Sequence, residues 1–241
     1  MQRKKRIQAM QFWIKKENEM EDQRIEFLKR TETGAITDGM KLIGICGWMD
    51  GIHPANPSSK ICGRAFTLQF STVRDPMQKT YNMYAVFDQC KPGDVVVVSA
   101  PHVGAVVGEN MMFALAGKGI AGMVLDGRTR DWGVIMESGI PHFSRGPAIM
   151  VPSDFQITAV QVPIVCGGAV VEPGDYIVGD VDGVISLPQA RIDDVIYQAE
   201  MVSQVELEMD QAIKHGIEMQ DLIKISHKKK VTRPINGDKK E

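Results

Sequence analysis

The fold of this chain is decided by residues 119–146, GIAGMVLDGRTRDWGVIMESGIPHFSRG. An apolar strand ends near Leu125, a charged turn follows, and a short helix leads into a second strand that starts near Pro141. Strand, turn, helix and strand make one βαβ unit, and ligands in such sheets bind at the carboxyl ends of the strands. We therefore expect the charged residues of the turn to gather at that edge: Asp126, Arg128, Arg130 and Asp131.

A charged turn of this kind can simply face solvent. Here the strand before the turn is apolar on both faces, and its Asp-Gly pair permits a sharp reversal, so rigid structure holds the turn. A carboxylate beside a guanidinium also suits a 2-oxo acid, because the carboxylate can hold a hard divalent cation and the guanidinium can pair with an anionic substrate. The residues alone leave both interpretations open.

The run VLDGRTRD, with GENM upstream and PGDYIVGDVDGV downstream, resembles the RraA-like family over roughly residues 33–208. That family joins metal-dependent class II aldolases of the 4-hydroxy-4-methyl-2-oxoglutarate type, which also decarboxylate oxaloacetate, to the regulator of ribonuclease activity A. The resemblance implies an α/β fold of the layered β/β/α swivelling-domain type with helical extensions at both ends. We expect a charged helical extension over 1–32, a catalytic domain over 33–215 and a charged C-terminal tail over 216–241.

The activity implied by the resemblance is that of a lyase, which breaks a carbon–carbon bond of a 2-oxo acid through a metal-stabilised pyruvate enolate. Asp131 would hold Mg²⁺ or Mn²⁺, and Arg130 would neutralise substrate charge. Backbone amides at the start of a helix would grip the substrate carboxylate, at Gly108, Glu109, Asn110 and Met111. Three residues are the expected catalytic set: Glu109, Arg130 and Glu206. For Glu109 the alternative is a first-turn acid favoured by the helix dipole.

Residues 192–213 show the apolar spacing of an amphipathic helix. At about 100° per residue, Glu206 falls on the apolar stripe of that helix, where a carboxylate needs a partner. The family places a glutamate of its C-terminal helix into a neighbouring subunit's active site, and Glu206 matches it; a peripheral salt bridge is the alternative. By resemblance the protein is a closed homo-oligomer, a trimer or a dimer of trimers, with sites at subunit boundaries.

Other segments predict the remaining elements. Residues 61–72 and the uniformly apolar DVVVVSA indicate strands of a covered, parallel sheet, and residues 76–90 predict a helix. Asp38 offers either helix capping or a role at a subunit-interface site. Beyond Gly146 the chain is expected to be mainly β, with Asp180 and Asp182 as turn-forming acids outside the catalytic set.

Composition narrows the function class. A chain of 241 residues with 44% hydrophobic content suits one large domain or two small ones, and a net charge of −2 gives no case for nucleic-acid binding. The four cysteines lack metal-site spacing, and no apolar run reaches membrane-spanning length. These features predict a cytoplasmic protein with no membrane partner, and the resemblance implies a small-molecule 2-oxo acid substrate.

One residue departs from the family pattern. Aldolases of the family carry an acid three residues after the Arg-Asp aspartate, where this chain has Val134. Valine can neither bind a metal-bound water nor relay a proton, so the substrate choice or the activity is expected to differ. Two alternatives follow: a non-enzymatic regulator that binds a ribonuclease or helicase, and a metal-dependent lyase for a sugar-derived oxo acid.

Overall fold

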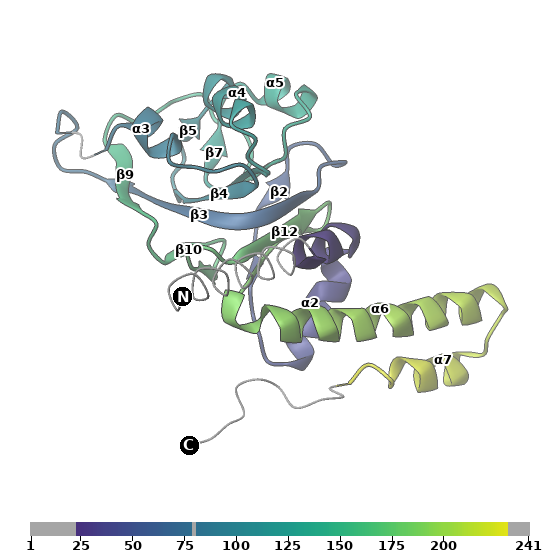
Figure 1. The fold of residues 1–241 in the computed structure, drawn as a ribbon. Coiled ribbons are helices and arrows are strands. Elements are labelled where there is room, and N and C mark those ends of the chain that lie inside the picture. The colour runs from purple at the N-terminus through teal and green to yellow at the C-terminus, as the bar shows by residue number, and fades with distance from the viewer. Residues whose placement is uncertain (1–22, 79–80, 231–241) are drawn as a thin grey trace, which may run out of the picture.

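The computed structural model describes residues 23–78 and 81–230, and a mixed sheet lies at its centre (Figure 1). Within that part of the chain the sheet has nine strands in the order β1-β13-β12-β3-β4-β6-β8-β2, with β9 paired to β3. The bounds are β1 Trp48–Met49, β2 His53–Pro54, β3 Ile61–Thr72, β4 Asp94–Ser99, β6 Gly122–Asp126, β8 His142–Ser144, β9 Phe155–Val160, β12 Tyr176–Asp180 and β13 Gly183–Leu187.

The middle of the sheet is parallel and buried on both faces. β3, β4, β6 and β8 run parallel, and alternate valines of β4 point into different cores: Val96 and Val98 into one, Val95 and Val97 into the other. Residues 61–72 and DVVVVSA thus form the covered parallel strands that the sequence predicts. The βαβ unit is also confirmed, because β6, α5 (Trp132–Glu137) and β8 follow one another with β6 parallel to β8.

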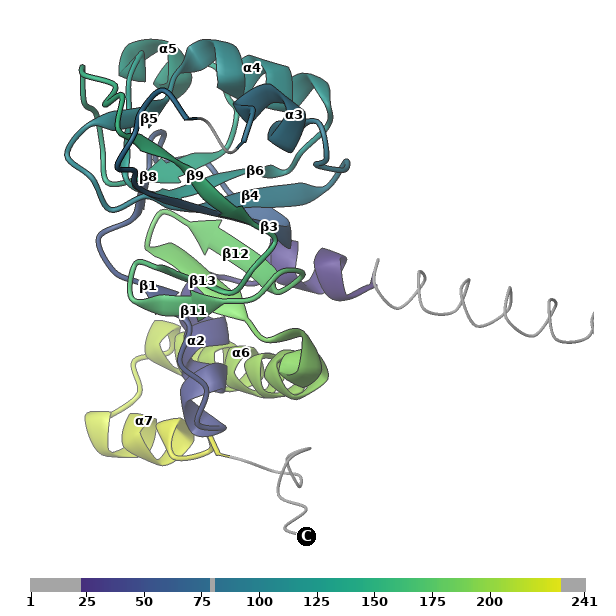
Figure 2. The same cartoon turned by 90° about the vertical axis from the view of Figure 1, so that its left-hand side faces the viewer.

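The two faces of the sheet are covered by different elements, as Figures 1 and 2 show. α3 (Met83–Phe87), α4 (Glu109–Gly117) and α5 pack on one face. On the other face lies the hairpin of β10 (Ile164–Cys166) and β11 (Ala169–Val171), while α2 (Thr33–Leu42) and α6 (Ile192–Lys214) pack against β12 and β13. The chain therefore has the layered α/β fold that was predicted, and α6 matches the predicted amphipathic helix.

The helix predicted over residues 76–90 is wrong in its length. α3 spans only Met83–Phe87, and the side chain of Asn82 accepts a hydrogen bond from the amide of Ala85, which starts the helix there. Residues 79–80 lie outside the described part of the chain. The apolar spacing favours one long helix, but the cap at Asn82 sets the start of α3.

Of the region expected to be a charged C-terminal tail, 216–241, the structure describes residues 216–230. α7 (Met219–Ser226) folds back beside α6, and Lys228 pairs with Glu208 of that helix. At the other end, residues 23–30 are helical, Leu28 is buried, and Arg24 forms a bidentate ion pair with Asp193. The rest of the N-terminal extension, residues 1–22, lies outside the described residues.

Within the described ranges, no helix combines the length and the apolar composition needed to cross a bilayer.

Candidate functional site

Two short strands bring the predicted site residues together. β5 (Ala105–Val107) pairs in parallel with β7 (Arg128–Thr129), and the amide of Arg130 donates to the carbonyl of Val107. Each strand leads directly into the start of a helix, β5 into α4 and β7 into α5. Because paired parallel strands end side by side, Gly108 and Glu109 come to lie next to Arg130 and Asp131.

Asp131 stands at the junction of the two helix starts. Its backbone is left-handed, with φ 59° and ψ 34°, a conformation that Asp tolerates better than most residues. Its Oδ2 accepts a hydrogen bond of 3.1 Å from the Glu109 amide and lies 3.5 Å from Nε of Arg130. The carboxylate of Asp131 thus caps α4, and 36% of its side chain remains exposed.

Gly108 is required by this arrangement. A Cβ at this position would lie 2.4 Å from Oδ2 of Asp131 and 3.0 Å from the Arg130 side chain. Because the φ of Gly108 is −143°, an ordinary extended value, the constraint is the close approach of Asp131 and not the backbone conformation.

A loop after β8 forms the opposite wall of the site. The amide of Thr129 donates to the Gly146 carbonyl, the amide of Ala148 donates to the Thr129 carbonyl, and Arg128 donates to the carbonyl of Pro147. The result is a pocket of about 490 Å³, a size typical of small-ligand sites. It is lined by Arg130, Asp131, Pro147, Ala148 and Ile149.

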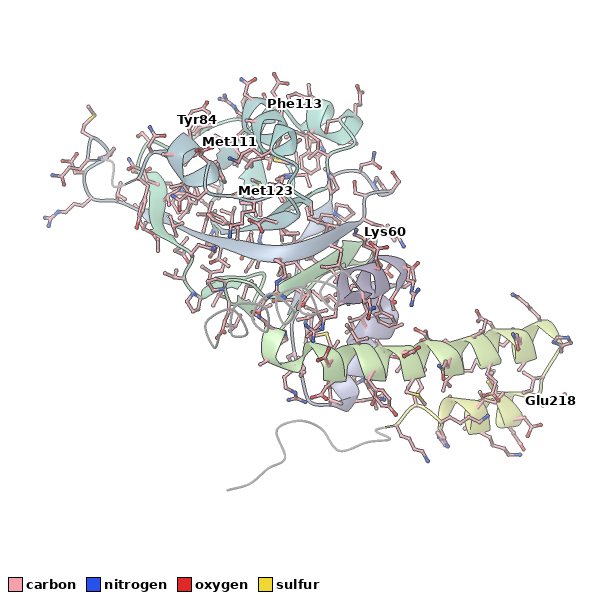
Figure 3. All side chains as sticks on the ribbon, in the orientation of Figure 1. Lys60, Tyr84, Met111, Phe113, Met123 and Glu218 are labelled. Carbon is pink, nitrogen blue, oxygen red and sulfur yellow. The ribbon has the colours of Figure 1, made fainter. Side chains whose placement is uncertain are left out.

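The backbone amides at the start of α4, which are predicted to bind the substrate carboxylate, partly bind within the protein. Of the amides at the α4 start, that of Glu109 is bound to Asp131, so the remaining orphan amides of the first turn belong to Asn110 and Met111. Figure 3 shows Met111 on α4, on the same side of the sheet as α5. Glu109 is the first residue of α4, as either of its two proposed roles requires.

Asp126 and Arg128 do not join the pocket. Asp126 is buried at the end of β6, where it accepts hydrogen bonds from Nε of Arg145 and from the Gly167 amide of the β10–β11 turn. The Arg128 side chain donates a hydrogen bond to the Pro147 carbonyl in the loop after β8. Of the four charged residues of the turn, therefore, Arg130 and Asp131 line the pocket.

Glu206 lies on the other side of the sheet from this pocket. α6, which carries Glu206, packs on the face of the sheet opposite α4 and α5, and Glu218 lies at the turn between α6 and α7 (Figures 1 and 3). The Glu206 carboxylate lies 2.8 Å from Nζ of Lys229, which also pairs with Asp38 at 3.0 Å. Within one chain, therefore, Glu206 forms the salt bridge that was the alternative to catalysis.

Asp38 does not cap a helix. It lies inside α2, and the start of α2 is bound instead by Asp180, whose carboxylate accepts from the amide and the hydroxyl of Thr33. Burial alone would raise the pKa of Asp180, but the bonds from Thr33 and from the Asp182 amide outweigh it and lower the pKa.

His142, for which a surface or loop position is expected from the absence of any histidine pair with metal-ligand spacing, lies instead in the interior. It is fully buried under the site, its Nε2 lies 2.8 Å from the Thr129 hydroxyl, and the Trp132 ring packs edge-on against it. Burial lowers the pKa of His142 to about 4, so the ring is neutral at neutral pH. The sequence signal for this burial is the place of His142 at the start of the strand expected near Pro141, which the structure shows to be β8.

A larger pocket, of about 700 Å³, lies at the opposite edge of the sheet. It is lined by the amino-terminal ends of β3 and β4 together with the helical segment 23–30, and Lys60 at its rim is seen in Figure 3. It contains none of the predicted site residues. The smaller pocket at the carboxyl edge is the better candidate because ligands of such sheets bind there.

Comparisons with known proteins agree with the fold and the motif. A family model described as Aldolase/RraA, RraA-like, matches residues 33–186. A Halalkalibacterium halodurans protein, assigned provisionally as a 4-hydroxy-4-methyl-2-oxoglutarate aldolase, is 33% identical over 169 residues, which cover 69% of this chain and 77% of that protein.

Solved structures give the same picture. An uncharacterized Pseudomonas syringae protein matches with a TM-score of 0.75 at 30% identity, over 84% of this chain and 97% of that one. Streptomyces coelicolor RraAS2, described as an unusual member of the RNase ES inhibitor RraA protein family, matches with a TM-score of 0.72 at 29% identity, over 78% and 97% of the two chains.

Proposed function

Because this chain belongs to the RraA-like family, we propose that it is a divalent-metal-dependent lyase that cleaves a carbon–carbon bond of a 2-oxo acid. The observation that carries the proposal is the arrangement of Asp131, Arg130 and the α4 start around one pocket at the carboxyl edge of the sheet. The reactions are retro-aldol cleavage of a 4-hydroxy-2-oxo acid, decarboxylation of oxaloacetate, or both.

The residues present fit a weakly held, oxygen-ligated ion. Within residues 23–78 and 81–230, no three His, Cys, Asp or Glu side chains are grouped closely enough to form a metal cage. Mg²⁺ is commonly held by one or two carboxylates and completed by waters and substrate. Asp131 is such a carboxylate: it is partly exposed, and both of its contacts above are made through Oδ2. When bound, Mg²⁺ or Mn²⁺ would supply a Lewis acid for the 2-oxo group.

Each remaining group has a distinct task. Arg130, whose side chain is 52% exposed, neutralises the negative charge of the substrate and of the enolate that forms as the bond breaks. The free amides of Asn110 and Met111 orient the substrate carboxylate. Glu109 accepts the proton of the C4 hydroxyl in the retro-aldol direction, because a carboxylate can act as a general base and a guanidinium stays protonated.

A neighbouring subunit completes the site in this proposal. Glu206 belongs to α6, which packs on the opposite face of the sheet from α4 and α5 (Figure 1), so in this proposal it reaches a site only in a closed oligomer, a trimer or a dimer of trimers. There it would exchange its pairing with Lys229 for a role in proton transfer.

The test is a steady-state assay on oxaloacetate and on 4-hydroxy-4-methyl-2-oxoglutarate with Mg²⁺. Activity should vanish with chelator, Asp131→Asn should abolish it, and Arg130→Ala should cost about 100-fold or more, the scale for losing a positioned electrostatic group. Asp210→Asn, an exposed acid on α6, is the matched control and should stay active. Turnover by metal-stripped protein above the background of the free ion would contradict the mechanism.

A regulator of RNA degradation is the second candidate. It is favoured by the 29% identity to the Streptomyces coelicolor family member and by Val134, which is exposed on α5 where family aldolases have an acid. For a pure regulator, wild type and Val134→Glu would both fail to cleave any 2-oxo acid. For a lyase, Val134→Glu should raise retro-aldol turnover of 4-hydroxy-4-methyl-2-oxoglutarate.

A further inference from the structure

The two walls of the candidate pocket differ in character. One wall carries the only charged residues that line it within the described chain, Arg130 and Asp131. The other wall is made by Pro147, Ala148 and Ile149, and the Ile149 side chain is 93% exposed. The next two residues are also exposed and apolar, Met150 at 55% and Val151 at 50%. A bound molecule therefore meets charge on one side and hydrocarbon on the other.

The residues that line the pocket offer a substrate little net positive charge. Asp131 lies 3.5 Å from the Arg130 guanidinium and offsets part of its charge. Of the other arginines of this region, Arg145 pairs with the buried Asp126, and Arg128 donates to the Pro147 carbonyl and does not line the pocket. One guanidinium and one metal-binding carboxylate suit a substrate with a single carboxylate beside its 2-oxo group.

A second carboxylate at the far end of the substrate would face the apolar wall. An alkyl group gains from contact with Ile149, whereas a carboxylate that makes the same contact gives up part of its hydration and gains no cationic or hydrogen-bonding partner there. This wall therefore favours an alkyl group over a carboxylate.

We propose that the natural substrate is a 4-hydroxy-2-oxo monocarboxylic acid with an alkyl arm at C4, an inference that rests on the proposed lyase function. In its cleavage the C4 hydroxyl gives its proton to a base, the C4 carbonyl forms, and the C3–C4 bond breaks. The electron pair of that bond passes to C3 as the enolate of pyruvate, which then takes up a proton. The products are pyruvate and an uncharged aldehyde or ketone, and Ile149 is the specificity-determining residue.

Paired substrates test this inference. Wild-type kcat/KM is measured with Mg²⁺ on 4-hydroxy-4-methyl-2-oxopentanoate and on 4-hydroxy-4-methyl-2-oxoglutarate, which differ by a distal carboxylate. The alkyl substrate should be preferred by about tenfold or more, the ratio expected for about 1.4 kcal/mol of discrimination. Ile149→Lys should shift the preference toward the dicarboxylate by a similar factor, mainly through KM.

The control is Val170→Lys, which makes the same kind of change at an exposed valine of β11 across the sheet, 64% exposed, and should leave the ratio unchanged. A wild-type preference for the dicarboxylate, or an Ile149→Lys ratio equal to that of wild type, would overturn the inference while leaving the lyase function in place.

If neither substrate is cleaved, the proposed function fails, and binding still tests the pocket. Calorimetric titration with Mg²⁺ present should then find 4-methyl-2-oxopentanoate bound more tightly than 2-oxoglutarate. Tighter binding of 2-oxoglutarate would overturn the assignment of an apolar arm.

Discussion

Gly108 leaves room for the Asp131 carboxylate, which occupies the space that a Cβ at position 108 would fill. We predict that Gly108→Ala displaces Asp131 and lowers metal-dependent lyase activity by about 100-fold, since misplacing a reacting group by about 1 Å can have that effect. The measurement is kcat/KM with saturating Mg²⁺, together with thermal unfolding.

The matched control is Gly117→Ala in the same helix, where a Cβ would meet nothing within 4 Å. It should keep full activity and raise stability slightly, because Ala is the better helix former. Equal activity of the two variants would show that the contact between Gly108 and Asp131 does not position the site.

At His142 the consequence is a dependence of stability on pH. The folded protein binds a proton on this ring only near pH 4, whereas an unfolded histidine binds it near 6.5. Between these values the unfolded state holds more protons than the folded state. The free energy of unfolding is therefore highest, as far as His142 is concerned, above pH 6.5, and it decreases by an amount on the order of 3 kcal/mol as the pH drops toward 4.

Urea denaturation at several pH values between 4.5 and 7, supported by NMR titration of the His142 ring, measures this effect. His142→Gln should flatten the pH dependence in that window. A ring that titrates near its ordinary value would contradict the prediction.

How much of the site could be predicted differs from residue to residue. Arg130 and Asp131 were found because a motif places them together at a strand end. The structural role of Asp126 was not found, because its partners Arg145 and Gly167 are 19 and 41 residues away along the chain. Local sequence shows which residues carry charge, but long-range contacts decide which of those charges remain available to a ligand.

At the scale of elements, the start of α2 depends on a residue far along the chain. Asp180, at the end of β12, accepts hydrogen bonds from the amide and hydroxyl of Thr33 and from the Asp182 amide. We predict that Asp180→Ala lowers the free energy of unfolding by about 2–4 kcal/mol, because it leaves buried donors without an acceptor.

Chemical denaturation checks this prediction, with Asp182→Ala as the neighbouring control at an exposed position. The control should change stability by about 0.5 kcal/mol or less, as is usual on surfaces. A loss at Asp180 no larger than that at Asp182 would show that the cap contributes little to the fold.

Element prediction succeeded where one pattern persisted and failed where a local contact intervened. The apolar run of β4 and the periodic stripe of α6 are long enough to determine their structure. α3 is shorter than its apolar spacing suggests because Asn82 caps it. α7 was not predicted because it spans only eight residues inside a charged segment, although Asp221 and Lys224 are its only charged residues. Such effects depend on partners that a window of sequence does not contain.

At the scale of the whole molecule, the sheet separates two groups that the proposed mechanism needs together. The pocket of Arg130 and Asp131 lies on the side of α4 and α5, and Glu206 lies on α6 across the sheet (Figure 1). If Glu206 takes part in catalysis, it must come from another chain, and the two defects should then complement one another in mixed oligomers.

We predict that Asp131→Asn and Glu206→Gln are each nearly inactive and that their mixture regains activity. In a ring of subunits assembled at random from equal amounts, about a quarter of the sites pair an intact Asp131 with an intact Glu206 from the neighbour, so about a quarter of wild-type activity should return. The measurement is turnover after joint unfolding and refolding, with light scattering to confirm the oligomer. Each variant refolded alone is the control, and Glu208→Gln, the neighbouring acid paired with Lys228, should behave as wild type. An inactive mixture of oligomers would contradict shared sites, and full activity of Glu206→Gln alone would remove Glu206 from catalysis and leave Glu109 as the base.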